Sequence, residues 1–283
     1  STGYLDSEAV GDSWEHPAGN LPHAIVFFKN RQRAAGTYTF TSEDGVTAGN
    51  YPAVQICVKQ GILTTAGTGS YLGTQARTAS IRPASNMRLY GGFASTFSGT
   101  NTAGRNQRKT PTRVSADVMN SDYRNNSAHV FTLSNVKNVI IDGFRLYSGN
   151  ANTYASSYFP LDADGNEINI GYGGGIFVNN GLAAQADRID VTGNIIRNCV
   201  FSNCSAPDGA CIYVNGTNKK ADGSYSRAEL TVINCVLRNS TAGDMHGSKD
   251  YYSGDIEGSH MTDDAVITAN GNAHIWLRNC DIV

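Results

Sequence analysis

The chain has 283 residues, of which 40% are hydrophobic, and this is enough to form a large buried core. Its 24 acidic and 22 basic residues nearly cancel. They form neither a basic stripe suited to nucleic acid nor an acidic block typical of a disordered tail. No run of 18 apolar residues occurs, so the sequence predicts no membrane-spanning helix.

A helix is expected near the start, at residues 20–33. Asn20 is a suitable N-cap for the apolar stretch that follows, and Pro22 stands in the first turn, where proline is tolerated. Farther along, "AVQICVKQGIL" (53–63) and "TASIRPASNMRLYGGFAS" (78–95) alternate in the manner of strands. The polar and basic segment "TNTAGRNQRKTPTR" (100–113) is interpreted as a solvated surface loop with four cations. These are Arg105, Arg108, Lys109 and Arg113.

Two short motifs then recur to the end of the chain. In the first, an apolar run leads to a Gly or Asn, followed by inward-facing apolar residues at alternate positions. The Gly or Asn positions are Gly143, Asn198, Asn234 and Asn279. Phe144, Cys199, Cys235 and Cys280 follow directly, and Leu146, Phe201, Leu237 and Ile282 come two residues later. Gly and Asn both tolerate positive φ, so this position predicts a corner between strands.

The second motif is centred on isoleucine. "GGGIFVNNG" (173–181), "GACIYVNG" (209–216) and "AVITANG" (265–271) align at Ile176, Ile212 and Ile267, with a weaker copy at Phe131. Asn179, Asn215 and Asn270 also align. The two motifs are 13 residues apart at the shortest, as from Cys199 to Ile212, and longer steps contain 10 or 19 additional residues. A fixed step that tolerates insertions at defined corners predicts a solenoid of stacked parallel coils.

The predicted fold is therefore all-β, a right-handed parallel β-helix with a short N-terminal capping helix. A solenoid needs its open end covered. We expect one domain over 1–283, with a cap region at 1–52 and coils at 53–283. The chain stops within a strand motif at 281–283, which leaves open a continuation into further coils or an anchor.

The cysteines of the first motif come one per coil, a spacing that favours core packing over a metal site or a catalytic thiol. Cys199 and Cys235 are expected to be buried, reduced neighbours. Disulfides remain an alternative, and Cys204–Cys211 is the first pair to consider.

The segment "LDADGNEI" (161–168) has two interpretations. Asp162, Asp164 and Asn166 are oxygen ligands of the kind that Ca²⁺ takes, whereas Asp-Gly is also a strong signal for a tight hairpin. Apart from this calcium ion, no cofactor is expected.

The two 19-residue insertions, near 152–171 and 243–262, fall at the same corner. They flank a coil that crosses this corner in "APDGA" (206–210), so they would form the walls of a groove about 10 Å wide. Its predicted substrate-binding residues are Tyr154, Tyr158, Asp208, Asp250, Tyr251, Tyr252, Glu257 and His260. His246 and Lys249 are the acid–base candidates if the protein is an enzyme. Ordinary variable loops at both insertions are the alternative.

Several of these segments, in order, resemble right-handed parallel β-helix proteins of Gram-negative bacterial surfaces and secretions. They include "LYGGFAS", "VIIDGFRLYSGNAN" and "GGGIFVNN…NCVFSNCSA". That group is related to polymorphic outer membrane proteins and to pectate-lyase-like repeats. The resemblance implies the fold and an extracellular or outer-membrane location, but no activity, because a fold does not determine a function.

Two functions remain open. One is a surface module that binds a glycan or a partner protein along its flank, in the manner of an adhesin. The other is a polysaccharide lyase or glycoside hydrolase of the β-helix type. The polygalacturonase-type and pectate-lyase-type signatures are absent, so the sequence does not decide whether the protein is an enzyme.

Overall fold

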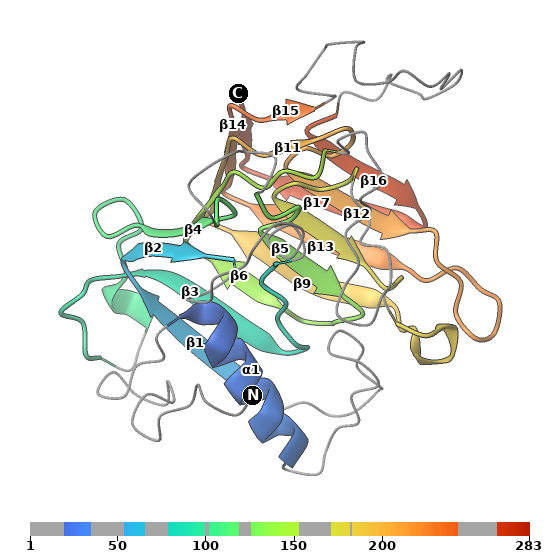
Figure 1. The fold of residues 1–283 in the computed structure, drawn as a ribbon, viewed down its shortest axis with the longest axis horizontal. Helices are drawn as coiled ribbons and strands as arrows, with labels where there is room; N and C mark the ends of the chain where they lie inside the picture. Colours follow the sequence, from blue (N-terminus) through green and yellow to red (C-terminus); the bar gives the residue numbers. More distant parts are fainter. Residues whose placement is uncertain are drawn as a thin grey trace.

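The structure is a computed structural model that describes residues 20–34, 54–65, 79–99, 102–118, 126–152, 171–181, 183–242 and 265–283. Within these ranges the chain is mostly β-strand, with one α-helix, α1 (Leu21–Ala34), and two short 3₁₀ helices, η1 (Thr102–Gly104) and η3 (Gln185–Asp187). The strands are arranged in parallel sheets, which confirms the expectation of an all-β architecture (Figure 1).

Three sheets contain nearly all of the strands. The first sheet has the order β1 (Val54–Lys59), β3 (Met87–Phe93), β6 (Ile140–Asp142), β9 (Val191–Arg197), β13 (Ala228–Ile233) and β17 (Ala273–Arg278). The second sheet runs β2 (Gly61–Thr64), β4 (Thr112–Ser115), β7 (Phe144–Tyr147), β10 (Val200–Ser202), β14 (Val236–Arg238) and β18 (Asp281–Ile282). The third sheet contains β5 (Phe131–Ser134), β8 (Ile176–Asn179), β12 (Ile212–Gly216) and β16 (Ile267–Gly271), and a small fourth sheet pairs β11 (Ser205–Ala206) with β15 (Thr241–Ala242).

The predicted alignment of the motifs is confirmed by the strand register. Phe201 pairs with Leu146 on one side and with Leu237 on the other. In the third sheet, Ile212 pairs with both Ile176 and Ile267. The inward side chains of these strands form one continuous apolar core.

The N-terminal helix is also confirmed. The Oδ1 atom of Asn20 accepts a hydrogen bond from the backbone N–H of His23 at 2.9 Å, which makes Asn20 the N-cap. Leu21, Ala24 and Ile25 share one face of α1 and are buried in the main core. Figure 1 shows α1 lying beside β1, the edge strand of the first sheet.

Two inward cysteines of the first motif pack as expected. Cys199 and Cys235 are buried in the core, and all six cysteines of the chain are free. Each Sγ donates to a backbone carbonyl, from Cys199 to the oxygen of Arg197 at 3.2 Å and from Cys235 to that of Ile233 at 3.3 Å. These cysteines therefore act as small core residues.

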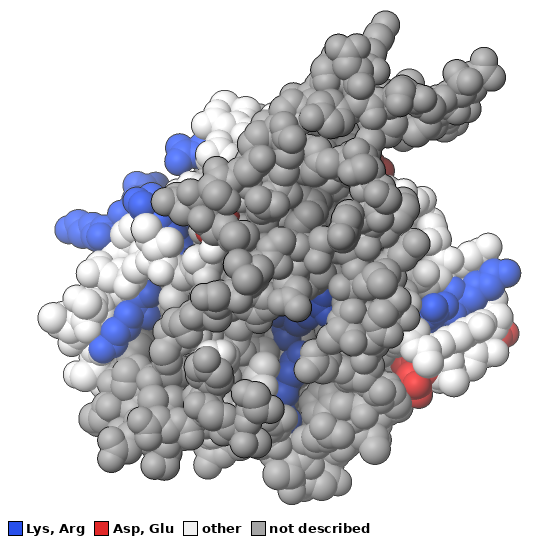
Figure 2. All heavy atoms as spheres, viewed as in Figure 1, with Lys and Arg blue, Asp and Glu red and all other residues white. Residues whose placement is uncertain are grey.

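The basic side chains of the described residues are dispersed over the face drawn in Figure 2. On the face drawn in Figure 2, the Lys and Arg side chains of the described residues lie in several separate places and not in one patch. This agrees with the near balance of 22 basic and 24 acidic residues in the whole chain.

The corners between the first and second sheets are the most regular feature of the fold. Asn198, Asn234 and Asn279 have φ of 54°, 53° and 52°, and Gly143 has φ of 83°, so the predicted left-handed corner is confirmed. The amides also hydrogen-bond along the stack. Nδ2 of Asn279 donates to Oδ1 of Asn234, and Nδ2 of Asn234 donates to Oδ1 of Asn198, both at 3.3 Å.

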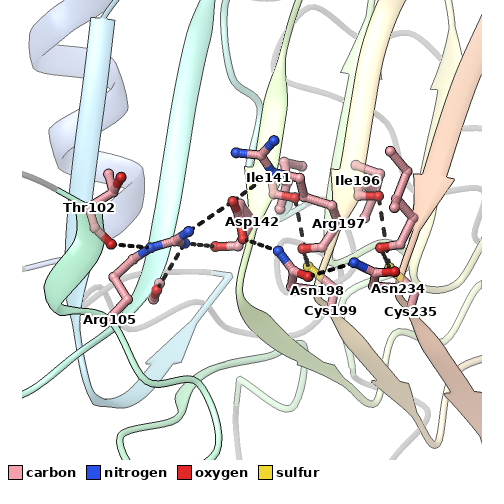
Figure 3. A network of polar contacts seen from close by, with 12 residues as sticks. Thr102, Arg105, Ile141, Asp142, Ile196, Arg197, Asn198, Cys199, Asn234 and Cys235 are labelled. Carbon is pink, nitrogen blue, oxygen red and sulfur yellow. Dashed lines mark hydrogen bonds and ion pairs between the residues drawn. The ribbon is translucent and has the colours of Figure 1, made fainter. Parts of the chain in front are cut away.

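The ladder ends on a buried carboxylate (Figure 3). Nδ2 of Asn198 donates to Oδ1 of Asp142 at 2.9 Å, while Arg105 and Arg197 donate to Oδ2 at 3.0 and 2.7 Å. Burial alone would raise the pKa of Asp142, but the hydrogen bonds from Arg105, Asn198 and Arg197 outweigh it and lower the pKa.

The expectation that 100–113 carries four solvated cations is therefore wrong for one of them. Arg105 is only 11% exposed and also lies over the ring of Tyr90, with its Cζ 4.9 Å from the centroid. It is buried because the Asp142 carboxylate requires a cationic partner in the protein interior. Arg108, Lys109 and Arg113 are exposed, as expected.

Candidate functional site

The candidate site is built around Asp208, which stands at the corner between β11 and β12. The backbone fixes this corner, because Asp208 N–H donates to the oxygen of Gly171 and Gly173 N–H donates to the oxygen of Asp208, each at 3.1 Å. Gly209 has φ of 61°, so the chain turns immediately after the aspartate. The Asp208 Oδ1 atom accepts a hydrogen bond from the hydroxyl of Thr268 on β16.

A row of aromatic rings lies next to this carboxylate. Tyr213 points outward from β12, and its in-register neighbours are Phe177 on β8 and Thr268 on β16. The ring of Tyr172 lies against Tyr213 with centroids 4.4 Å apart, and Phe177 stacks on His129 at 4.9 Å. Tyr172 is 38% exposed, so it is the member of the row that a ligand can reach from solvent.

A polar row runs parallel to the aromatic one, two residues farther along each strand. It consists of Ser134, Asn179, Asn215 and Asn270. Nδ2 of Asn270 donates to the hydroxyl oxygen of Tyr213 at 2.8 Å, which joins the two rows. The outer side of the third sheet therefore places aromatic rings beside amides and hydroxyls. Phe177, Tyr213, Ser134 and Asn179 are buried there, whereas Asn270 is exposed.

The surroundings of the central tyrosine disfavour its ionisation. Burial raises the pKa of Tyr213 to about 12, with the neighbouring Tyr172 and Asp208 adding to the shift against the hydrogen bond from Asn270. Like an ordinary tyrosine, Tyr213 is protonated at physiological pH, and its hydroxyl can both donate and accept a hydrogen bond. We refer to Tyr172, Asp208, Tyr213, Thr268 and Asn270 as the Asp208 cluster.

Of the predicted groove residues, only Asp208 belongs to the described part of the chain. Those outside it are Tyr154, Tyr158, His246, Lys249, Asp250, Tyr251, Tyr252, Glu257 and His260. The calcium candidates Asp162, Asp164 and Asn166 also lie outside the described residues. The groove walls and the calcium loop therefore stay predictions.

The other members of the Asp208 cluster were missed by the sequence interpretation. It used the inward residues of the isoleucine motif, whereas Tyr213 and Thr268 occupy the outward position directly after Ile212 and Ile267. The signal was present, because the corresponding position on β8 is Phe177. An aromatic residue facing outward on neighbouring strands indicates a covered or functional face.

The described residues show no further centre of a familiar kind. Among them, no three His, Cys, Asp or Glu side chains gather closely enough to hold a metal ion. None of the helices in the described ranges is both long and apolar enough to cross a membrane. Comparison with known proteins gave no match to a protein family, a curated protein or a solved structure.

Proposed function

We propose that the chain forms one right-handed parallel β-helix that binds a glycan at the exposed part of the Asp208 cluster, on the outer side of its third sheet. The fold proposal is supported by the order in which the chain visits the sheets. From β3 onward it passes through the first, second and third sheets in turn, and each strand pairs in parallel with the equivalent strand of the next pass. A solenoid is the architecture that this repetition favours.

The binding proposal is carried by the exposed ring of Tyr172. It packs on Tyr213, which fixes its orientation, and its backbone pairs with that of Asp208 in a parallel β-bridge. A rigid aromatic face suits the apolar C–H face of a sugar, and nearby carboxylate, amide and hydroxyl groups suit its hydroxyls. Asn270 and Thr268 supply these groups from the neighbouring strand.

The proposed location is extracellular or on the outer-membrane surface. Its support is the resemblance of "LYGGFAS" and of the Asn-Cys segments to β-helix surface proteins of Gram-negative bacteria. A partner protein bound on the same face is the competing form of this proposal. Glycan binding should depend strongly on Tyr172. Binding of a partner protein should depend on it less, since a protein interface spreads its contacts over a larger area.

A β-helix lyase or hydrolase remains the alternative function. Hydrolysis by paired carboxylates needs two acidic side chains about 5–10 Å apart on either side of the scissile bond. Asp208 supplies one acidic group, and His246 and Lys249 remain the predicted acid–base residues.

The experiment that separates these functions uses a panel of neutral and acidic polysaccharides. Binding is measured on immobilised glycans, and the same samples are assayed for new reducing ends and for the ultraviolet absorbance of unsaturated products. Saturable binding without turnover supports the proposal. Turnover of any polymer supports the enzyme instead, and the absence of both binding and turnover with every glycan contradicts both.

A further inference from the structure

The chain that follows Tyr172 has no side chains of its own to fix it. Tyr172 is followed by Gly173, Gly174 and Gly175, and glycine has the largest conformational freedom of all residues. Tyr172 itself lies outside the strands and pairs with Asp208 in an isolated parallel bridge. The orientation of its ring therefore depends on hydrogen bonds that reach this glycine run from neighbouring passes of the chain.

His129 and Val130, which precede β5, supply two of these hydrogen bonds. Nδ1 of His129 lies 2.9 Å from the carbonyl oxygen of Gly173, and Val130 N–H donates to the oxygen of Gly174 at 3.2 Å. Two successive residues thus hold two successive carbonyls of the glycine run. Gly173 N–H in turn donates to the backbone oxygen of Asp208 at 3.1 Å. Gly173 is therefore held at both its N–H and its carbonyl.

The contact with Gly173 defines the tautomer of His129. A carbonyl oxygen can only accept a hydrogen bond, so Nδ1 carries the proton and donates it. His129 is only 3% exposed, so its side chain does not face solvent. Its effect on a ligand must therefore pass through the residues that it holds.

The imidazole is also the inner end of a stack of four rings. It lies on Phe177 with centroids 4.9 Å apart and an angle of 17° between the planes. The centroids of Phe177 and Tyr213 are 6.0 Å apart, and those of Tyr213 and Tyr172 are 4.4 Å apart. The stack thus runs from the interior to the exposed ring of Tyr172. Its first member, His129, also holds the backbone next to its last member.

We propose that His129 is a positioning residue of the glycan site. The hydrogen bond from its Nδ1–H to Gly173 fixes the backbone beside Tyr172 and keeps the Tyr172 ring packed on Tyr213. The inference rests on the proposed function, because it assigns a buried residue to the same site. A ring that is already held in its binding orientation loses less conformational entropy when the glycan binds.

Two substitutions separate the hydrogen bond from the ring. His129→Phe keeps a flat ring against Phe177 and loses the donor. His129→Asn loses the ring, but its amide nitrogen is attached to Cγ, as Nδ1 is, and can donate to Gly173. The readout is hydrogen–deuterium exchange, followed by NMR, at the amides of Gly173 and Asp208, whose hydrogen bonds flank Tyr172.

We expect the Gly173 and Asp208 amides to exchange about tenfold faster in His129→Phe, because one hydrogen bond that opposes local opening is lost. In His129→Asn they should exchange as in the wild type. The amide of Val232, in the interior of the first sheet, is the internal control and should exchange equally in all three proteins. Unchanged exchange at Gly173 in a folded His129→Phe variant, or equally fast exchange in His129→Asn, would overturn the proposal.

Glycan affinity gives the functional readout. Dissociation constants are measured for the wild type, His129→Phe, Tyr172→Ala and the double variant, with each polysaccharide of the panel that the wild type binds. His129→Phe should weaken binding about tenfold when Tyr172 is present and should have no further effect in Tyr172→Ala. A loss of the same size in both backgrounds, or no loss in either, contradicts positioning. If the wild type binds no polysaccharide, glycan binding fails as a function, and the exchange rates still decide whether His129 positions Tyr172.

A measurement on the wild type does not depend on the folding of any variant. With ¹⁵N-labelled histidine, long-range ¹H–¹⁵N correlations identify the ring nitrogen of His129 that carries the proton, once the ring is assigned through its backbone resonances. We expect a proton on Nδ1 at neutral pH. A proton on Nε2 alone would overturn the proposal, because Nδ1 could then not donate to Gly173.

Discussion

The side-chain amide of Asn198 donates to the buried carboxylate of Asp142 at 2.9 Å, and this bond joins the corner ladder to an ion-pair network. Asn198 turns the chain with φ of 54°, while Asp142 ends a strand on the preceding pass. A residue chosen for its backbone conformation therefore also satisfies a buried charge. Substitutions at these two positions should have separate and measurable effects.

Asp142→Asn should destabilise the protein by about 3 kcal/mol at neutral pH, because it leaves the largely buried Arg105 without a carboxylate. Wild-type Asp142 has a lowered pKa. The contribution of the Asp142 carboxylate to the free energy of unfolding is therefore fully present above the pKa of an aspartate in the unfolded chain, which is about 4. It is lost as the pH falls through the pKa of Asp142 in the folded protein. Urea unfolding is measured at pH 7 and at pH 3. The difference in free energy of unfolding between the wild type and Asp142→Asn should be smaller at pH 3. An equal difference at the two pH values would contradict this account. Asp222→Asn, at an aspartate in an exposed turn, serves as the control.

Asn198→Val should destabilise the protein by about 1–2 kcal/mol or more, because a β-branched residue is strained at positive φ and cannot donate to Asp142. Asn198→Gly keeps the backbone conformation and loses only the side-chain hydrogen bonds, so it should cost less. Chemical denaturation of both variants gives the comparison. If Asn198→Gly and Asn198→Val lose the same free energy of unfolding, the left-handed backbone conformation is not the reason for asparagine at this position.

Gly209→Ala tests the corner that carries Asp208. An added Cβ would lie 2.5 Å from the carbonyl oxygen of Ile212 and 3.0 Å from Cβ of Tyr213, at φ of 61°. Gly223→Ala is the matched control, since its φ is 79° but nothing lies within 4 Å of the added atom. Both variants bear the strain of positive φ, and Gly209→Ala should lose at least about 1 kcal/mol more. Equal losses in thermal or urea unfolding would show that the corner can relax.

The sequence predicted the strands and the corners well, because both depend on local rules. Alternating apolar positions set the inward faces, and Asn198 and its equivalents are where positive φ is needed. A further corner column at Ser148, Asn203 and Asn239, after strands of the second sheet, was not recognised, because serine does not suggest positive φ.

The polar network and the candidate site were harder to predict. Arg105 and Asp142 are 37 residues apart, and nothing in either local sequence indicates that their charges meet in the interior. Tyr172 and Tyr213 come from different passes of the chain, so their contact depends on how the corner at Asp208 packs. Such pairings are set by tertiary structure and leave little trace in a single sequence.

Glycan binding by the wild type, Tyr172→Ala and Tyr225→Ala is the measurement that tests the central claim most directly. Tyr225 is also an exposed tyrosine, at 55%, but it lies in the turn paired with Lys219 and makes no ring contact with the Asp208 cluster. Removal of a stacking ring should weaken binding by about tenfold or more, equivalent to about 1.4 kcal/mol. The account predicts this loss for Tyr172→Ala and unchanged binding for Tyr225→Ala, with both variants folded by circular dichroism. Unchanged binding in a folded Tyr172→Ala variant would contradict it.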